Sequence, residues 1–365
     1  MKPITREELQ TLLRRKKPVH ERELDGLDLG GLDLSEAVFH GCRFHDCAFD
    51  GARMHTAALV NCDLRGLDLI DCDLQGVAFS QCDLRGAQFG SGELRETVFD
   101  HCDLRGAHFH GQSLEACQFL TCALDEADFG NGRWNRTGAM QSRFQGTNLS
   151  GASLRHAIVH DADLTRTKLD GLSLDESLLI GCDLSGQDLS HRPMARSTFM
   201  QSKFSGTNLE GGDLRNGNFI EAQFQGARLS GAKLDRSMFL KARFEDTDLR
   251  DCQAPAAVFQ EAKLIDTRLN GAHLSTSSWK QSSHQGSDFG DADLSHADLS
   301  HVQGEDCRFK GARLHRAKLH KIRLERGALR GADTKNAEGN NDKLAAAEQR
   351  TMAIEAELRA TETPS

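Results

Sequence analysis

Cysteine offers the most chemistry in this sequence, because thiols bind zinc, form disulfides and act as nucleophiles. Five of the 11 cysteines recur every 20 residues, at Cys42, Cys62, Cys82, Cys102 and Cys122. This spacing predicts a straight ladder of parallel side chains, whereas zinc needs converging ligands and a disulfide needs particular torsions. Every cysteine also stands at a position otherwise taken by small residues such as Ala, Ser or Thr. We therefore expect buried, unreactive thiols, and the odd number of cysteines favours a reduced compartment.

Acidic and histidine side chains form no pattern that is typical of catalysis. Asp63, Asp83 and Asp103 each precede an arginine by two residues, which predicts a ladder of ion pairs on a solvated wall. The 16 histidines stand mostly at outward positions. Nothing in the sequence matches GxSxG, Walker A, HExxH or a dinucleotide-binding fingerprint. We predict a protein that is not an enzyme and that uses no cofactor and no metal.

A five-residue repeat runs from Leu24 to Leu329 as 62 pentapeptides without an insertion or deletion. Its central position, here called i, is Leu, Phe, Trp, Met or Val in 58 of the 62 repeats. All 19 Phe and both Trp occupy this position, and all 11 cysteines occupy position i−2, where small residues prevail. Positions i−1, i+1 and i+2 are mainly polar. The pattern predicts that positions i and i−2 point inward.

A period of five residues corresponds to about 72° per residue, which matches neither an α-helix nor a single β-strand. The chain must turn a corner in every pentapeptide, and four corners close one coil of four pentapeptides. The segment CDLRG recurs accordingly at 62–66, 82–86 and 102–106. We predict an all-β solenoid of about 15 coils. Its core is packed solid with Leu and Phe, which leaves no interior cavity for a substrate.

These repeats resemble the pentapeptide-repeat family, whose consensus is A(D/N)LXX, over residues 22–331. The resemblance implies a right-handed quadrilateral β-helix. The opening segment KPVHERELDGLDLGGLDLS is also similar to the start of bacterial members associated with type VI secretion.

Both ends of a solenoid expose strand edges that need covering. Residues 1–21 are predicted to form a capping helix and lead-in, because Thr5 and Glu8 match a capping box. Residues 332–341 form a polar linker, and 342–365 form a C-terminal helix. Two roles remain open for this helix: a cap on the last coil, or a dimerisation helix through the seam Leu344, Ile354 and Leu358.

Charge is distributed unevenly along the chain, whose net charge is −9. Residues 19–130 hold 21 acidic and 7 basic residues, whereas 305–331 hold 9 basic and 3 acidic residues. Either end could contact a partner of opposite charge, and the alternative interpretation is that the charge only keeps the rod soluble. The candidate interaction residues are Asp63, Asp71, Asp73, Asp83, Glu93, Glu96, Asp103, Arg313, Arg316, Lys318, Lys321 and Arg323.

We predict a bacterial, non-enzymatic scaffold or adaptor that binds a protein partner, with type VI secretion as one setting. The first alternative is a DNA mimic that binds gyrase or topoisomerase, as in the fluoroquinolone-resistance branch of the resembled family. The second is a secreted effector module. The acidic half speaks against direct nucleic-acid binding. No apolar run is long enough for a membrane span, and no secretory signal opens the sequence. We therefore expect a cytoplasmic protein, with export by a dedicated system as the alternative.

Overall fold

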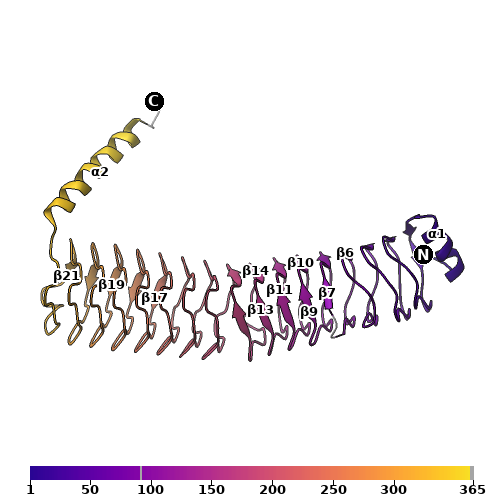
Figure 1. Ribbon diagram of the computed structural model, residues 1–365, viewed down its shortest axis with the longest axis horizontal. Helices are drawn as coiled ribbons and strands as arrows, with labels where there is room; N and C mark the ends of the chain where they lie inside the picture. Colours follow the sequence, from indigo (N-terminus) through magenta and orange to yellow (C-terminus); the bar gives the residue numbers. More distant parts are fainter. Residues whose placement is uncertain (91–92, 362–365) are drawn as a thin grey trace.

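The chain winds into a long rod of short parallel strands, shown by a computed structural model that describes residues 1–90 and 93–361 (Figure 1). Side chains of the last helix are described as far as Thr351. Strand residues pair with residues 20 positions further on, from Val19 with Phe39 to Lys318 with Glu338. The ladder therefore makes about 16 turns. The predicted solenoid is confirmed, and it is about one turn longer than the pentapeptide count suggested.

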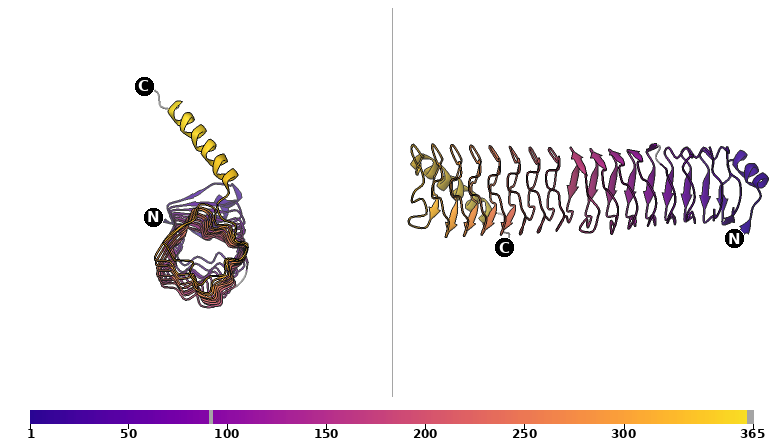
Figure 2. Two further views of the ribbon diagram at one scale, coloured as in Figure 1. Left: turned by 90° about the vertical axis from the view of Figure 1, so that its left-hand side faces the viewer. Right: turned by 90° about the horizontal axis from the view of Figure 1, so that it is seen from below.

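Corners are made by residues at position i+2, most of which have a left-handed backbone conformation. Asn61 has a φ angle of 53° and Gly66 one of 65°. Glycine adopts this conformation at little cost and Asn tolerates it, which explains the Gly that ends each CDLRG segment. Because every turn has its corners at the same places, the turns superpose into one closed outline when viewed along the rod (Figure 2, left).

The longest sheet has nine parallel strands, each one turn from the next. Its members are β2 (Val19–His20), β4 (Val38–His40), β5 (Ala58–Val60), β6 (Ala78–Ser80), β8 (Val98–Asp100), β10 (Gln118–Leu120), β12 (Gly138–Met140), β14 (Ile158–His160) and β16 (Leu178–Ile180).

Two five-stranded sheets and one two-stranded sheet form the remaining regular strands. The first five-stranded sheet contains β7 (Glu93–Arg95), β9 (Ser113–Glu115), β11 (Arg133–Asn135), β13 (Ser153–Arg155) and β15 (Ser173–Asp175). The second contains β17 (Arg243–Glu245), β18 (Lys263–Ile265), β19 (Ser283–Gln285), β20 (Gln303–Glu305) and β21 (Arg323–Leu324). The two-stranded sheet pairs β1 (Lys2–Pro3) with β3 (Arg22–Glu23). Elsewhere the ladder continues through single bridges at the same spacing.

Residues at position i form the core, and identical residues stack on one another along the rod. The rings of Phe99 and Phe119 lie 5.0 Å apart and nearly parallel, and Phe79 stacks on Phe99 at 5.1 Å. Phe109 and Phe129 form edge-to-face contacts with Phe119. Aromatic pairs prefer both arrangements. The interior of this part of the rod is therefore filled with side chains.

Position i−2 is buried beside the preceding turn, and where its small residue carries a hydroxyl or a thiol, that group reaches a backbone carbonyl of the preceding turn. The hydroxyl of Thr97 donates to the Leu74 carbonyl at 2.9 Å, and the hydroxyl of Thr137 donates to the Leu114 carbonyl at 3.0 Å. The thiol of Cys102 points at the Phe79 carbonyl in the same way, at 3.3 Å. Cys, Ser and Thr thus act as weak or strong donors at the same place.

Helix α1 (Arg6–Arg14) covers the N-terminal end of the rod. The predicted capping box is present, since Thr5 accepts from the Glu8 amide and Glu8 accepts from the Thr5 amide. The buried side chain of Leu9 packs into the core.

At the other end, the segment 332–341 does not simply link two elements. It extends the ladder by pairing Asp333 with Arg313 and Glu338 with Lys318. Helix α2 (Asp342–Thr361) then leaves the rod and leans back toward its N-terminal end (Figures 1 and 2). Among the described residues, neither helix combines the length and apolarity that a membrane span requires.

Candidate interaction surfaces

The cysteine thiols are free, and ten of the 11 are buried, with Cys72 half-buried. Burial raises the pKa of the Cys182 and Cys252 thiols to about 12. In the ladder, the thiol of the next turn raises the pKa of Cys82 and Cys102 to about 12, and burial adds to this effect. A thiol with so high a pKa holds its proton at neutral pH and is a poor nucleophile and a poor metal ligand. The expectation of size-selected, buried thiols is confirmed in its geometry.

On the predicted acidic wall, carboxylates and guanidinium groups form ion pairs within each turn and between successive turns. Asp63, Asp83 and Asp103 stack in one column, as their bridges show. Arg85 Nη2 lies 2.6 Å from Asp83 Oδ2, and Arg85 Nε lies 3.7 Å from Asp103 Oδ2 in the next turn. Burial alone would raise the pKa of Asp103, but hydrogen bonds from Arg105 hold it below its usual value. The wall is therefore charge-compensated over these turns.

The other predicted acidic residues lie apart from this column. Asp73 and Glu93 occupy the opposite wall, half a turn further along the chain, where Glu93 pairs with Arg95 at 3.0 Å. Asp71 and Glu96 stand at corners. The structure thus brings together three of the seven acidic candidates and distributes the rest around the rod.

The predicted basic residues surround the last turns instead of forming one patch. Arg313 stacks between Asp293 and Asp333, and its guanidinium lies 3.0 Å from Asp293. Lys318 lies on a different wall, and Arg323 on a third. Arg316 stands exposed at a corner and Lys321 is half-buried under α2.

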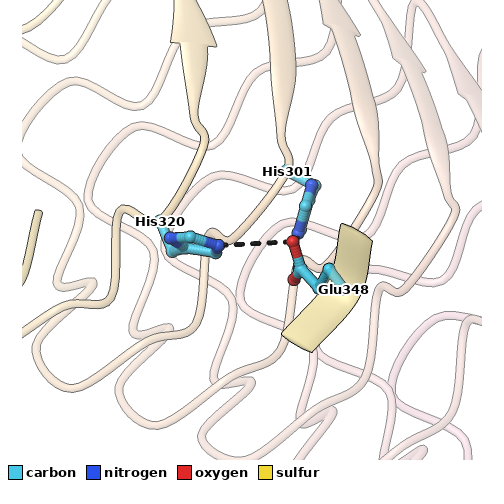
Figure 3. A group of neighbouring side chains, drawn as sticks. All are labelled: His301, His320 and Glu348. Carbon is cyan, nitrogen blue, oxygen red and sulfur yellow. Dashed lines mark hydrogen bonds and ion pairs between the residues drawn. The ribbon is translucent and has the colours of Figure 1, made fainter. Parts of the chain in front are cut away.

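Glu348 on α2 ties this helix to the last turns of the rod (Figure 3). His301 Nε2 lies 2.9 Å from Glu348 Oε1, and Lys321 Nζ lies 2.5 Å from Oε2. Hydrogen bonds from Lys321 and His301 lower the pKa of Glu348 to about 2. Asn341 adds a local cap, because its side chain accepts from the Leu344 amide at 3.1 Å. The contact was not predicted from the sequence.

The same cluster offers donor atoms for a metal ion, since His301, His320 and Glu348 present ligand atoms within 4.8 Å of one another. However, the Asn341 amide donates to His320 Nδ1 at 3.0 Å, which places the proton of a neutral imidazole on Nε2. That nitrogen faces Glu348 at 3.5 Å and would have to be unprotonated to bind a metal. The ammonium group of Lys321 also pairs with the Glu348 carboxylate, which a metal ion would need as a ligand. The arrangement fits an ion-pair cluster better than a metal centre.

The seam predicted for dimerisation is only partly described. Leu344 is 44% exposed and lines a groove of about 620 Å³ between α2 and the last turns. The side chains of Ile354 and Leu358 lie outside the described residues. Their role in dimerisation stays a prediction.

One of the four walls carries aliphatic side chains on its outer surface. This wall is the nine-stranded sheet, continued by bridges from Leu178 through Thr198, Asn218 and Met238 to Val258. We call 13 of its outward residues the apolar face: Val38, Val60, Val98, Leu120, Met140, Ile158, Leu178, Ile180, Met200, Ile220, Met238, Leu240 and Val258.

Residues of the apolar face are exposed or half-buried. Met140, Ile158 and Met238 are between 36% and 40% exposed. In the pentapeptide register, the outward positions of the other three walls hold two residues of these types, Ile70 and Ile265. The apolar side chains are therefore concentrated on one side of the rod rather than scattered over its surface.

The apolar face is large for a protein surface patch. Eleven steps between turns at about 4.8 Å make it roughly 53 Å long, and three strand residues make it about 10 Å wide. Its area is thus on the order of 500 Å², within the size range of the largest patches on soluble proteins, which are often functional. Its signal is present in the sequence, but only when positions i−1 and i+1 are compared between successive turns.

Comparisons with known families agree with the repeat pattern. The family described as pentapeptide repeat region matches residues 32–109. The family described as pentapeptide repeats (8 copies) matches 93–131, 141–171, 177–219, 202–239, 218–252, 239–275 and 287–326. The chain belongs to the pentapeptide repeat family.

Solved structures similar to this pentapeptide repeat protein include three of the same kind. A thylakoid-lumen protein of Arabidopsis thaliana is 29% identical, with a TM-score of 0.24 over 32% of this chain and 70% of that one. QnrB1, a plasmid-mediated fluoroquinolone resistance protein, is 16% identical, with a TM-score of 0.22 over 48% and 99%.

HetL, from the cyanobacterium Nostoc sp. strain PCC 7120, is involved in heterocyst differentiation regulation. It is 20% identical, with a TM-score of 0.15 over 92% of this chain and 94% of HetL. A search of curated proteins found no match. Because all three TM-scores are low, the family assignment rests on the matched repeats.

Proposed function

We propose that this pentapeptide repeat protein is a non-enzymatic scaffold that binds other proteins along the outer walls of its rod. The apolar face is the observation that carries the proposal. A chain that keeps 13 large aliphatic side chains on one wall and almost none on the other three leaves a contiguous patch of the size that marks protein contacts. Covering such a patch removes apolar surface from water, which is the main favourable term in protein association.

The interior supports the same proposal, because stacked Phe and Leu side chains fill the rod. Binding then takes place on the outer walls, each of which repeats its side chains every turn. A rigid parallel ladder presents these side chains already ordered, so little conformational entropy is lost when a partner docks.

A mimic of nucleic acid receives less support. Such a protein needs uncompensated negative charge at regular spacing, because phosphates are what a nucleic-acid-binding partner contacts. In the column of Asp63, Asp83 and Asp103, each carboxylate instead pairs with an arginine two residues on. We accordingly expect no inhibition of gyrase supercoiling at micromolar protein.

Site-specific photo-crosslinking in cells tests the scaffold. Benzoylphenylalanine replaces Ile180 on the apolar face, Gln223 on the acidic wall's continuation, or Arg155 on a third wall. We expect protein adducts of discrete mass, including one from Ile180 with the protein that covers the apolar face, and components of a type VI secretion system are the first other partners to test. A rod that yields no adduct from any wall would refute the proposal.

A further inference from the structure

The shape of the apolar face indicates what kind of protein surface could cover it. It is straight and about 53 Å long, whereas a helix of about 20 residues is only about 30 Å long. A second rod of the same pitch matches it turn for turn, because its side chains also repeat every 4.8 Å or so. We propose that the apolar face is covered by a second copy of this chain, in a face-to-face dimer. The inference rests on the proposed function, since it names the molecule that covers this wall.

The area is sufficient for such a dimer. Two copies of a patch on the order of 500 Å² bury roughly 1,000 Å² together, which is the lower bound for a specific interface. Homodimer interfaces are also more apolar than other contacts, as this face is. A two-fold axis lying in the interface would place the same residues on both sides, so one self-complementary wall serves both copies.

Charge also favours a second copy on this wall over contact through the others. Among the outward strand positions from 38 to 260 on this wall, Asp100 is the one carboxylate and there is no Lys or Arg. Two chains of net charge −9 can meet here with few like charges in contact, because the charged residues of this part of the rod lie mainly on the other three walls.

Separation of the two α2 helices and the distribution of charge both favour one relative direction of the two rods. The groove at the base of α2 is lined by Lys280, Ser300 and His320, so α2 rises from the last turns of the same wall and leans back toward the apolar face. A parallel copy would place a second α2 in the same space. An antiparallel copy keeps the two α2 helices at opposite ends of the dimer, and it sets the acidic residues 19–130 beside the more neutral half of the other rod.

Sedimentation equilibrium of the full-length protein tests the dimer. We expect twice the chain mass of 40.2 kDa at tens of micromolar protein. The double variant Ile180→Asp, Ile220→Asp should sediment as a monomer with an unchanged circular dichroism spectrum. Ile265→Asp is the matched control, because Ile265 is an exposed isoleucine on another wall. It should remain a dimer, as should a chain that lacks residues 342–365.

Several outcomes would overturn the inference: a monomeric wild type, a dimer that survives both face substitutions, or a dimer that is lost with α2.

The relative direction of the two rods is tested by thiol crosslinking with a short bis-maleimide. Val38→Cys mixed with Val258→Cys should crosslink if the rods are antiparallel, whereas Val38→Cys crosslinking to itself would mean parallel rods and refute our geometry.

The two proposals fail separately. A monomer whose Ile180 position still crosslinks to a different protein in cells would remove the second copy and leave the scaffold. A dimer that yields no adduct with a different protein from any wall would remove the scaffold and leave the second copy on the apolar face.

Discussion

His284 stands at position i where the repeat otherwise places Leu or Phe, and it is almost completely buried. Its ring stacks on Phe289 at 5.2 Å and meets Trp279 edge-on at 5.5 Å. The Ser282 hydroxyl donates to the Trp279 carbonyl, so it accepts from His284 Nε2 at 2.8 Å, and Nδ1 is left without a partner. Burial lowers the pKa of His284 to about 3. We predict that this side chain makes the rod sensitive to acid.

The magnitude follows from proton linkage. A histidine in the unfolded chain has a pKa of about 6.5, so below that pH the unfolded state binds a proton that the folded state refuses. Stability is therefore intact above pH 6.5 and falls as the pH drops toward 3. At pH 5 the pH lies roughly 1.5 units below the pKa of the unfolded histidine, so the free energy of unfolding is lower by about 2 kcal/mol. The result barely depends on the folded pKa, provided that it lies well below 5.

The assay compares the wild type with His284→Leu at pH 8 and pH 5. Guanidinium unfolding is followed by the fluorescence of Trp279, with Trp134→Phe in both backgrounds so that the probe reports on the turns around His284. The wild type should lose about 2 kcal/mol more than the variant between the two pH values. His108→Leu, which removes an exposed histidine, is the control and should behave like the wild type. Equal pH dependence of the wild type and His284→Leu would refute the reasoning.

Three further outcomes are expected. Phe119→Ala should destabilise the rod by about 3–5 kcal/mol because it opens a cavity between stacked rings. Arg105→Ala, on the outer surface, should lower the free energy of unfolding by less than about 1 kcal/mol. Equal shifts in melting temperature for the two variants would contradict the inward and outward assignments. A thiol reagent should label the native protein slowly and reach Cys72 first, and rapid labelling of several thiols would count against their burial. Glu348→Gln should speed tryptic cleavage at Arg350 without changing the melting of the rod, and unchanged cleavage would show that the ion pairs do not hold α2.

Most of the fold could be predicted because a pentapeptide period has few structural solutions. Positions i and i−2, the pairing between successive turns and the Thr5 capping box all follow from local spacing, and each is confirmed. Only the hand of the coil depended on the family resemblance. The repeat alone did not show that 332–341 continues the ladder, because Asp333 and Glu338 pair through backbone groups that any residue carries.

The candidate surfaces could be predicted less well. The ion pairs of Asp83 with Arg85 are local and were foreseen, but the contact of Glu348 with His301 joins residues 47 positions apart. It depends on the path of the chain between the last turn and α2, which no repeat determines. The apolar face was readable in principle. Each of its residues looks ordinary within its own pentapeptide, and the pattern becomes visible only between turns.

The four walls of the rod share a core but few side-chain contacts with one another, since outward residues on one wall lie mainly beside residues of the same wall one turn away. Stability in such a solenoid is approximately a sum over neighbouring turns. A substitution on the outer surface of one wall should therefore leave the others in place, as we expect for Ile265 and Ile180, which lie on two different walls. This independence lets one rod dimerise through its apolar face while it keeps its charged walls free for other proteins, and it lets each contact be removed without the rest.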